Sequence, residues 1–215
     1  MNRMLLGICA CACSWTALAM DIGSGIRTGD RVRLEKATPS DDTEAARIIT
    51  ESFQAAMAAR GAGIAVTLHI THDGLGGESA LGNVVLVDDS LAALPEDERV
   101  FEIAHELGHI DLGHFERMIA LFQQYVGDST DDHYIARTLN VHADDLSPAL
   151  QALEYEADAY GQALVSKVPG ALDGGIHTFQ RNVFRRGDFS HPSPRERMLK
   201  LEAALAEPAR LAAAR

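Results

Sequence analysis

Apolar side chains recur at helical spacing in two long segments of the chain. In residues 41–60 and again in residues 95–125, they follow one another every three or four positions, which predicts amphipathic helices. We expect Ser40 or Asp41 to cap the first helix and Gly61 to end it. The second begins with a proline and three acidic residues, a composition that suits the first turn of a helix. The apolar positions are Ala45, Ile48, Ile49, Phe53, Ala56 and Met57 in the first segment, and Val100, Phe101, Ile103, Ala104, Leu107 and Ile110 in the second.

Shorter apolar runs lie outside these two helices. Residues 64–70 and 84–87 are rich in β-branched side chains and are predicted to be strands, with a shorter strand at residues 79–81. A glycine-rich segment supplies the turn between the first two strands, at Gly74, Gly76 and Gly77. Val32 and Leu34 indicate a further short strand near the N-terminus.

The C-terminal half alternates between polar inserts and helical segments. Residues 127–145 are polar and rich in aspartate, with a single helical turn expected at residues 134–139. Further helices are predicted from Ser147-Pro148 to Lys167, at residues 178–184, and from the capping box Ser193-Pro194-Arg195-Glu196 to about Ala206, with a frayed tail beyond Pro208. Together the elements predict an α+β fold, mostly helical, in which a small β-sheet packs against the central helix of one domain over residues 20–215.

The first 19 residues have the organisation of a secretory signal peptide. Arg3 supplies a positive charge, residues 4–12 form an apolar run, and Ala17-Leu18-Ala19 matches a cleavage site. The run is shorter than the roughly 20 residues that span a bilayer. We therefore expect an exported protein, periplasmic or secreted, with no transmembrane segment in the mature chain. A buried N-terminal helix is one alternative, and a lipoprotein modified at Cys9, Cys11 or Cys13 ranks behind ordinary cleavage.

The charged residues limit the classes of partner. With 31 acidic against 19 basic side chains, the formal net charge is −12, which argues against binding to nucleic acid or to anionic lipid. All three cysteines lie within the expected signal peptide, so the mature chain is expected to have neither disulfides nor thiolate ligands. A metal ion would then be bound by histidine, aspartate or glutamate.

The pentapeptide His105-Glu106-Leu107-Gly108-His109 is the most specific signal in the chain. Residues four positions apart lie one turn apart on a helix, so both imidazoles can face one metal ion. Glu106 lies beside them and can take a proton from a metal-bound water. The pentapeptide lies in a strongly helical segment that follows a buried strand. The alternative interpretation is a pair of core histidines without a metal ion.

Zinc needs a third protein ligand, and the residues just downstream do not supply it. Metzincins have glycine three residues and histidine six residues after the second histidine, where this chain has Leu112 and Phe115. His114 lies five residues on, about 500 degrees around the helix, and cannot readily face the same ion from an unbroken helix. Glu154 and Asp158 share one face of a later helix, which leaves an acidic residue there as the candidate. A solvated helix acid is the alternative for Glu154.

Three motifs in this order resemble metallopeptidase family 48. They are the His-Glu-x-x-His pentapeptide, Glu154-x-x-Ala157-Asp158, and Ser190-His191-Pro192 followed by Glu196-Arg197. The resemblance covers about residues 80–201. The family consists of gluzincins and includes prenyl-protein proteases, heat-shock-linked membrane peptidases and periplasmic quality-control peptidases. This chain resembles a soluble, exported member, which argues against prenyl-protein substrates.

The resemblance implies a role for each matching residue. It implies one zinc ion per chain, bound by His105, His109 and Glu154, with Glu106 as the general base. Asp158 would hydrogen-bond a ligating imidazole and fix its tautomer. His191 would approach the metal or the substrate, and Arg197 would help to hold or polarise groups at the site.

The expected activity is that of a zinc-dependent endopeptidase that cleaves exported or misfolded proteins, with protein or peptide substrates as partners. A metal-bound water would attack the peptide carbonyl, with Glu106 as base and His191 or Arg197 as an oxyanion donor. The substrate is expected to add as a strand along a sheet edge formed by Ser79, Ala80, Leu81 and Gly82. One rival is a zinc-containing chaperone or assembly factor with little proteolysis, its metal capped by His191. A metal-binding module unrelated to peptidases is the other.

Overall fold

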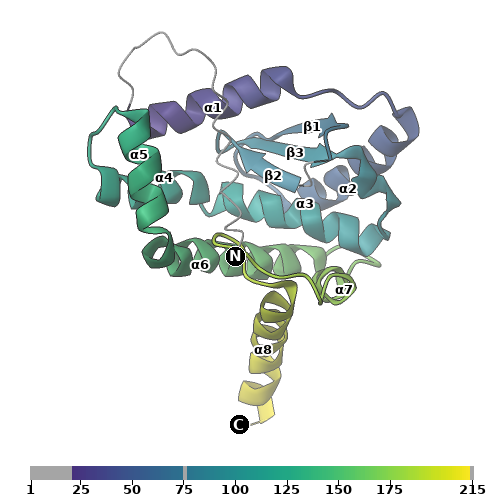
Figure 1. The fold of residues 1–215 in the computed structure, drawn as a ribbon. Helices are drawn as coiled ribbons and strands as arrows, with labels where there is room; N and C mark the ends of the chain where they lie inside the picture. The colour runs from purple at the N-terminus through teal and green to yellow at the C-terminus, as the bar shows by residue number, and fades with distance from the viewer. Residues whose placement is uncertain (1–20, 75–76, 214–215) are drawn as a thin grey trace.

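The computed structural model describes residues 21–74 and 77–213 (Figure 1). The signal peptide expected at residues 1–19, together with the cysteines in it, lies outside the described residues and stays a prediction. Among the described helices, none has the length and apolar character needed to cross a membrane.

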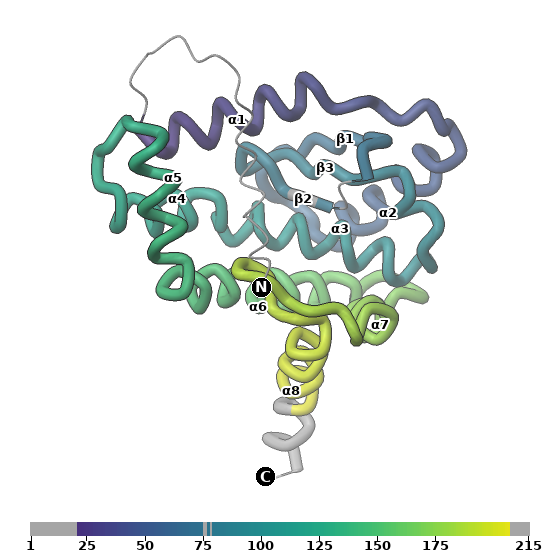
Figure 2. The backbone as a smooth tube through the Cα atoms, in the orientation of Figure 1, coloured from purple at the N-terminus to yellow at the C-terminus, as the bar shows by residue number. Residues whose placement is uncertain are grey.

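The described residues form a mostly helical α+β fold around a small sheet, as predicted. Helix α3 lies between the sheet on one side and α6 on the other, with α2 and α7 also packed against it (Figure 1). Helix α8 projects away from the body of the molecule below α6 and α7, as the backbone trace in Figure 2 shows. The elements are α1 (Ile22–Lys36), α2 (Thr43–Arg60), β1 (Thr67–Thr71), β2 (Gly77–Ala80), β3 (Val84–Asp88), the 3-10 helix η1 (Asp89–Ala93), α3 (Glu96–Asp111), α4 (His114–Val126), α5 (Asp132–Val141), α6 (Ala143–Val165), α7 (Gly174–Arg181) and α8 (Pro194–Ala213).

The sheet has the strand order β1-β3-β2. Strand β3 pairs in parallel with β1 and antiparallel with β2, and every one of its residues is buried. An uninterrupted apolar run is what a central strand covered on both faces requires. Strand β2 pairs only with β3 in this order, so its other side is an edge.

Two glycines allow α3 and α6 to approach closely. A Cβ atom on Gly108 of α3 would lie 3.1 Å from Cα of Ala157, and one on Gly161 of α6 would lie 3.1 Å from the backbone N of His105. Both distances are shorter than ordinary van der Waals contact, so a larger side chain at either position would push the helices apart. This close packing places residues of α6 directly beside the histidines of α3.

The structure corrects the predicted strand at Val32 and Leu34, which both lie in α1. Asp21 caps this helix by accepting a hydrogen bond from the backbone N–H of Ser24 at 2.8 Å. Two apolar residues with period two were too short a pattern to distinguish a strand from one face of a helix.

The helix expected over residues 95–125 is in fact two helices. Helix α3 ends at Asp111, Gly113 adopts a left-handed conformation with φ of 65°, and α4 starts at His114. Glycine is the residue that enters this region without steric cost, and here it ends one helix and lets the chain turn into the next.

Four C-terminal boundaries also differ from the prediction. The polar insert contains a ten-residue helix, α5, whose N-terminus is capped by the Asp131 carboxylate. Helices α6 and α7 begin before Ser147-Pro148 and Thr178, at Ala143 and Gly174, and α8 continues past Pro208 to Ala213. The capping box that starts α8 is confirmed: Ser193 and Glu196 exchange hydrogen bonds between side chain and backbone.

Candidate metal centre

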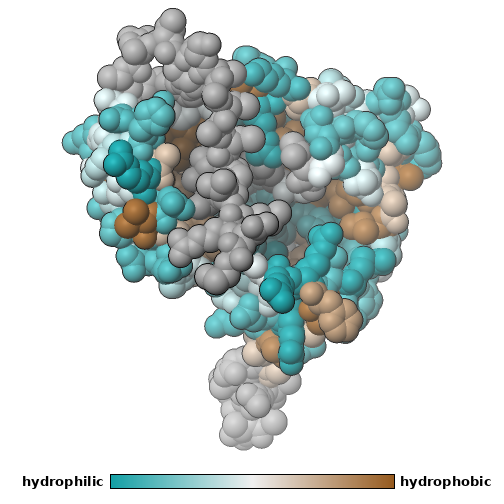
Figure 3. All heavy atoms as spheres, in the orientation of Figure 1, coloured by the Kyte–Doolittle hydropathy of each residue, from teal (hydrophilic) through white to brown (hydrophobic). Residues whose placement is uncertain are grey.

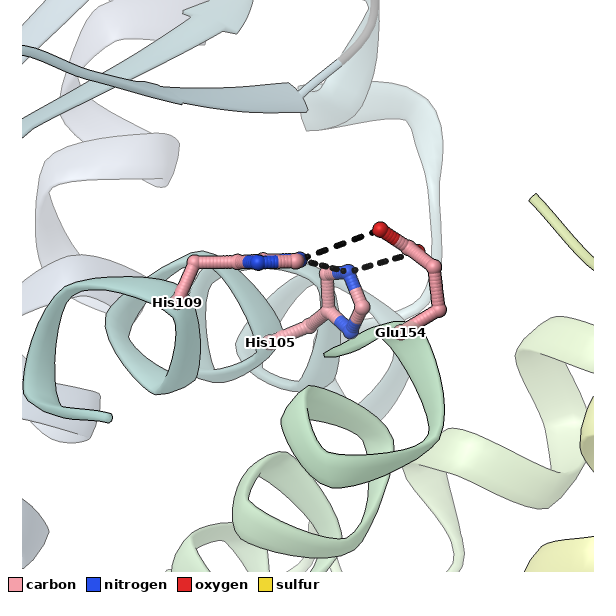
Figure 4. Close-up of side chains that lie close together, drawn as sticks. All are labelled: His105, His109 and Glu154. Atoms are coloured by element: carbon pink, nitrogen blue, oxygen red, sulfur yellow. Dashed lines mark hydrogen bonds and ion pairs between the residues drawn. The ribbon is translucent and has the colours of Figure 1, made fainter. Parts of the chain in front are cut away.

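Helix α3 carries the two histidines of the pentapeptide on one face. His105 is 5 % exposed and lies one helical turn before His109. Their Nε2 atoms are 3.1 Å apart and point to the same place (Figure 4). The helical spacing predicted from the sequence therefore brings the two imidazoles together.

Glu154 enters this group from α6. Its Oε2 atom lies 3.5 Å from Nε2 of His105, and its Oε1 atom lies 3.4 Å from Nε2 of His109 (Figure 4). One ligand atom from each of the three residues lies within 4.8 Å of the others. Glu154 is 7 % exposed, so the alternative of a solvated helix acid does not fit its surroundings.

The spacing of these atoms suits a tetrahedral metal ion. Zinc lies about 2.0–2.1 Å from nitrogen and oxygen ligands, so two ligands of one tetrahedral ion are about 3.3–3.4 Å apart. The three distances in the group are 3.1, 3.4 and 3.5 Å. In addition, Oε2 of Glu154 is buried and has no hydrogen-bond partner among the residues that the structure describes. The donor set and the spacing therefore fit, and His105, His109 and Glu154 could hold a metal ion.

A buried ion pair lies behind His105. Asp158, one turn after Glu154 on α6, places its Oδ1 atom 3.0 Å from Nδ1 of His105. Arg197 of α8 binds both carboxylate oxygens of Asp158, at 2.8 and 2.5 Å, and its Cζ atom lies 4.7 Å from the centre of the Phe179 ring. Arg197 therefore holds the carboxylate that orients His105.

The charges around the group favour a cation. Burial lowers the pKa of His105, but the carboxylates of Asp158 and Glu154 beside it outweigh burial and raise it to about 10. Burial and the neighbouring charge of His105 lower the pKa of His109 to about 3. Burial raises the pKa of Glu154, yet the neighbouring positively charged His105 brings it well below its ordinary value. The two carboxylates thus stabilise one positive charge in the group, on His105, while burial and that charge keep His109 neutral.

Glu106 is buried between α3 and the edge strand of the sheet. It is 6 % exposed, and a Cβ atom added to Gly77 of β2 would lie 3.3 Å from its Oε1 atom. Glycine at this position lets the strand pass directly over the carboxylate. This role of Gly77 was not predicted from the sequence, although a glycine in a strand can mark a close backbone approach.

The residues expected to bind substrate lie along β2 and the turn after it. Ser79 and Ala80 end the edge strand, and Leu81 and Gly82 connect it to β3. Leu81 has a φ of 53°, in the left-handed region that leucine seldom adopts, and its backbone N–H donates to the Asp30 carboxylate at 3.1 Å. Helix α1 therefore fixes the end of the edge strand.

A short loop holds His191 at the edge of the group. The Asp188 carboxylate accepts hydrogen bonds from the backbone N–H groups of Ser190 and His191, both at 2.8 Å. The Nε2 atom of His191 lies 3.7 Å from Oε1 of Glu154, and the side chain is 55 % exposed. His191 is thus close to the three ligand atoms but on the solvent side.

His114 is a further residue of the site that the sequence analysis set aside. His114 was excluded as a ligand on the assumption of an unbroken helix, but the left-handed Gly113 breaks the helix just before it. Its Nδ1 atom lies 2.9 Å from Nδ1 of His109. The sequence signal that pointed to it was the glycine four residues after His109, a residue typical of a helix end.

Helix α3 carries the His-Glu-x-x-His pentapeptide, and α6 places Glu154 beside its two histidines. In a mostly helical domain, this arrangement is typical of a metallopeptidase. The model of the family described as Peptidase family M48 matches residues 75–205 of this chain. The chain belongs to this family, which confirms the resemblance inferred from its three motifs and makes the protein a peptidase, a hydrolase of peptide bonds. A search of curated proteins finds no match.

Proposed function

We propose that the protein is a zinc-dependent endopeptidase that cleaves exported or misfolded proteins. The observation that carries the proposal is the convergence of one ligand atom each from His105, His109 and Glu154 within 4.8 Å. Two imidazoles and one carboxylate are a donor set of catalytic zinc sites, which keep a fourth position for water or substrate. Membership of Peptidase family M48 supports the reaction class.

Each side chain of the site has its own role in peptide hydrolysis. A bound zinc ion would polarise the scissile carbonyl and acidify the attacking water. Glu106 accepts the proton of that water and returns it to the leaving amine, which needs a carboxylate that is ionised before attack. Asp158 keeps the His105 ring in place through its Nδ1 atom, and Arg197 keeps Asp158 in place.

The substrate is proposed to extend along the free edge of β2. An extended peptide can add to this edge as another strand and hydrogen-bond to its backbone. Gly77 places the edge directly over Glu106, so a peptide bond held there is brought to the base. The anchoring of Leu81 by Asp30 fixes the other end of the same strand.

The surface supports protein or peptide substrates over nucleic acid. The formal net charge of −12 repels a phosphate backbone. The face in Figure 3 is mainly hydrophilic, with apolar side chains in small separate groups. Export to the periplasm or the medium remains a proposal that rests on the signal peptide expected at residues 1–19.

A zinc-containing chaperone with little proteolysis is the second candidate function. The observation that favours it is the position of His191, whose Nε2 atom is 3.7 Å from a proposed ligand oxygen. An imidazole this close can occupy the fourth position on a metal ion and exclude water from it.

Metal analysis combined with digestion tests the proposed function. We expect one equivalent of zinc per chain in the metal-replete protein, and cleavage of casein or of a peptide library that stops when a chelator removes the metal and returns when zinc is restored. Less than half an equivalent would contradict the metal site. A full equivalent with no cleavage of any substrate would favour the chaperone.

Replacing His191 distinguishes its two possible roles. We expect His191→Ala to change the turnover rate by at least about tenfold, which corresponds to about 1.4 kcal/mol of activation free energy. A faster enzyme means that the imidazole caps the metal, and a slower one means that it supports the transition state. Ser190→Ala is the matched control, because it removes the neighbouring hydroxyl that contacts His191 but leaves the imidazole. Unchanged kinetics would remove His191 from the site.

A further inference from the structure

His114 is buried directly behind one of the proposed ligands. It is the first residue of α4 and is 3 % exposed. Its Nδ1 atom lies 2.9 Å from the Nδ1 atom of His109, within hydrogen-bond distance. The two rings meet edge to face, with centroids 4.9 Å apart and an interplanar angle of 79°.

The pairing of these nitrogens determines where their protons lie. His109 faces His105 and Glu154 through Nε2, so this atom must carry a lone pair if it binds a metal ion. A neutral His109 then carries its proton on Nδ1 and donates it to Nδ1 of His114. His114 in turn must accept at Nδ1 and carry its own proton on Nε2.

The other side of the His114 ring agrees with this arrangement. Its Nε2 atom is buried, has no hydrogen-bond partner within the described part of the chain, and lies 3.4 Å from Oε2 of Glu156. Glu156 is fixed by Arg117, which binds both of its oxygens at 2.6 and 3.0 Å. A proton on Nε2 therefore points toward a carboxylate, and its loss would place a lone pair there instead.

Each of the two proposed ligand histidines thus has a separate support. His105 is held at Nδ1 by Asp158, which belongs to the same helix as Glu154. His109 is held at Nδ1 by His114 of α4, and the left-handed Gly113 separates this helix from α3. Metal-ligating histidines commonly need such a partner on the second nitrogen to fix the tautomer and the ring orientation.

We propose that His114 is a positioning residue that holds His109 as the Nδ1–H tautomer with Nε2 aimed at the metal ion. This inference rests on the proposed metal site. His114 is not itself one of the ligands, because it reaches His109 at Nδ1, the ring nitrogen on the far side from Glu154. Its effect on the metal is exerted through His109.

Two substitutions separate hydrogen bonding from packing. Leucine fills the buried space but accepts no hydrogen bond, whereas the side-chain oxygen of asparagine can take the place of Nδ1 and accept the same proton. We expect His114→Leu to weaken zinc and cobalt affinity by about 10- to 100-fold, the usual effect of losing such a partner. His114→Asn is expected to restore most of the affinity.

The measurement is competition with a chromophoric chelator on the full chain, with thermal unfolding of the metal-free proteins as a check on folding. His133→Leu is the matched control, since this histidine is exposed on α5 and contacts none of the ligands. Wild-type protein that binds no metal would overturn the proposed function as well. Two results with a metal-binding wild type would overturn the role of His114 alone. In the first, both His114 variants bind metal as tightly as the wild type. In the second, His114→Asn binds it as weakly as His114→Leu.

Nitrogen-15 resonances of the histidine side chains test the inference without any change at His114. In zinc-loaded protein we expect His109 to bear its proton on Nδ1 and to bind through Nε2. His105 serves as the internal reference, because its Nδ1 faces the Asp158 carboxylate and should also be protonated. A His109 that binds through Nδ1, or that carries no proton there, would refute the proposal even if His114→Leu fails to fold.

Discussion

Glu106→Gln is expected to reduce proteolysis by about 10²- to 10⁴-fold while zinc content stays at the wild-type level. Glutamine has the same size as glutamate but cannot accept the proton of the attacking water, and a positioned general base contributes a factor of this order. The equal size matters here because Glu106 is 6 % exposed and lies against Gly77 of the edge strand. A larger or smaller side chain would also move β2, and the result would no longer report on the base.

The turnover rate and the metal content are measured on the same preparation. Glu96→Gln is the matched control, since it makes the same chemical change in the exposed first turn of α3, away from the histidines. A Glu106→Gln enzyme with unchanged kcat/KM would exclude Glu106 as the base. A variant that loses both zinc and activity would show that Glu106 acts on the metal site itself.

The faces of the two helices were predictable because they depend on local helix geometry, whereas the role of Glu154 as third ligand was implied only by the family resemblance. The four-residue spacing of His105 and His109, and the shared face of Glu154 and Asp158, follow from the period of an α-helix alone. The central strand β3 was predictable for a similar reason, since its residues form an uninterrupted apolar run. In these segments, the local pattern and the tertiary structure agree.

The parts that were missed depend on where the chain turns. A helical pattern continues through residues 95–125, so the end of α3 is determined by one glycine, Gly113, and not by the apolar spacing. His114 is not in the ligand group, as expected, but with that turn unrecognised its contact with His109 was missed. Gly77 and Asp30 were missed because their contacts, with Glu106 and with Leu81, join residues distant in sequence.

The role of Arg197 could not be predicted from the sequence for a further reason. The resemblance implied that Arg197 holds or polarises groups at the site, which left open whether it supports another side chain or donates to the oxyanion. The structure places the guanidinium on Asp158, with Nη2 3.3 Å from Nδ1 of His105. Its contacts therefore favour a role in holding Asp158 over a role as oxyanion donor. The sequence could not distinguish these roles, because the contact depends on how α8 packs against α6.

Glu154→Ala is expected to lose zinc and activity together. The substitution removes one of the three proposed ligands, so the loss of affinity should exceed the roughly 10- to 100-fold effect of removing an outer partner. A ligand that binds only the folded state also stabilises it. Added zinc should therefore raise the unfolding temperature of the wild-type protein and leave that of Glu154→Ala unchanged.

Glu156→Ala is the matched control for this experiment, because it removes the same functional group from the same helix. Glu156 is rotated by about 200 degrees from Glu154, and its carboxylate pairs with Arg117 near the surface. An exposed ion pair of this kind contributes at most about 1 kcal/mol, so the variant should fold. The Glu156 carboxylate also faces Nε2 of His114, so the variant should keep a full equivalent of zinc at saturating metal, with at most the smaller loss of affinity of an outer partner. If Glu156→Ala released the metal and Glu154→Ala retained it, the face of α6 assigned to the site would be wrong, and with it the ligand set on which the proposed peptidase mechanism depends.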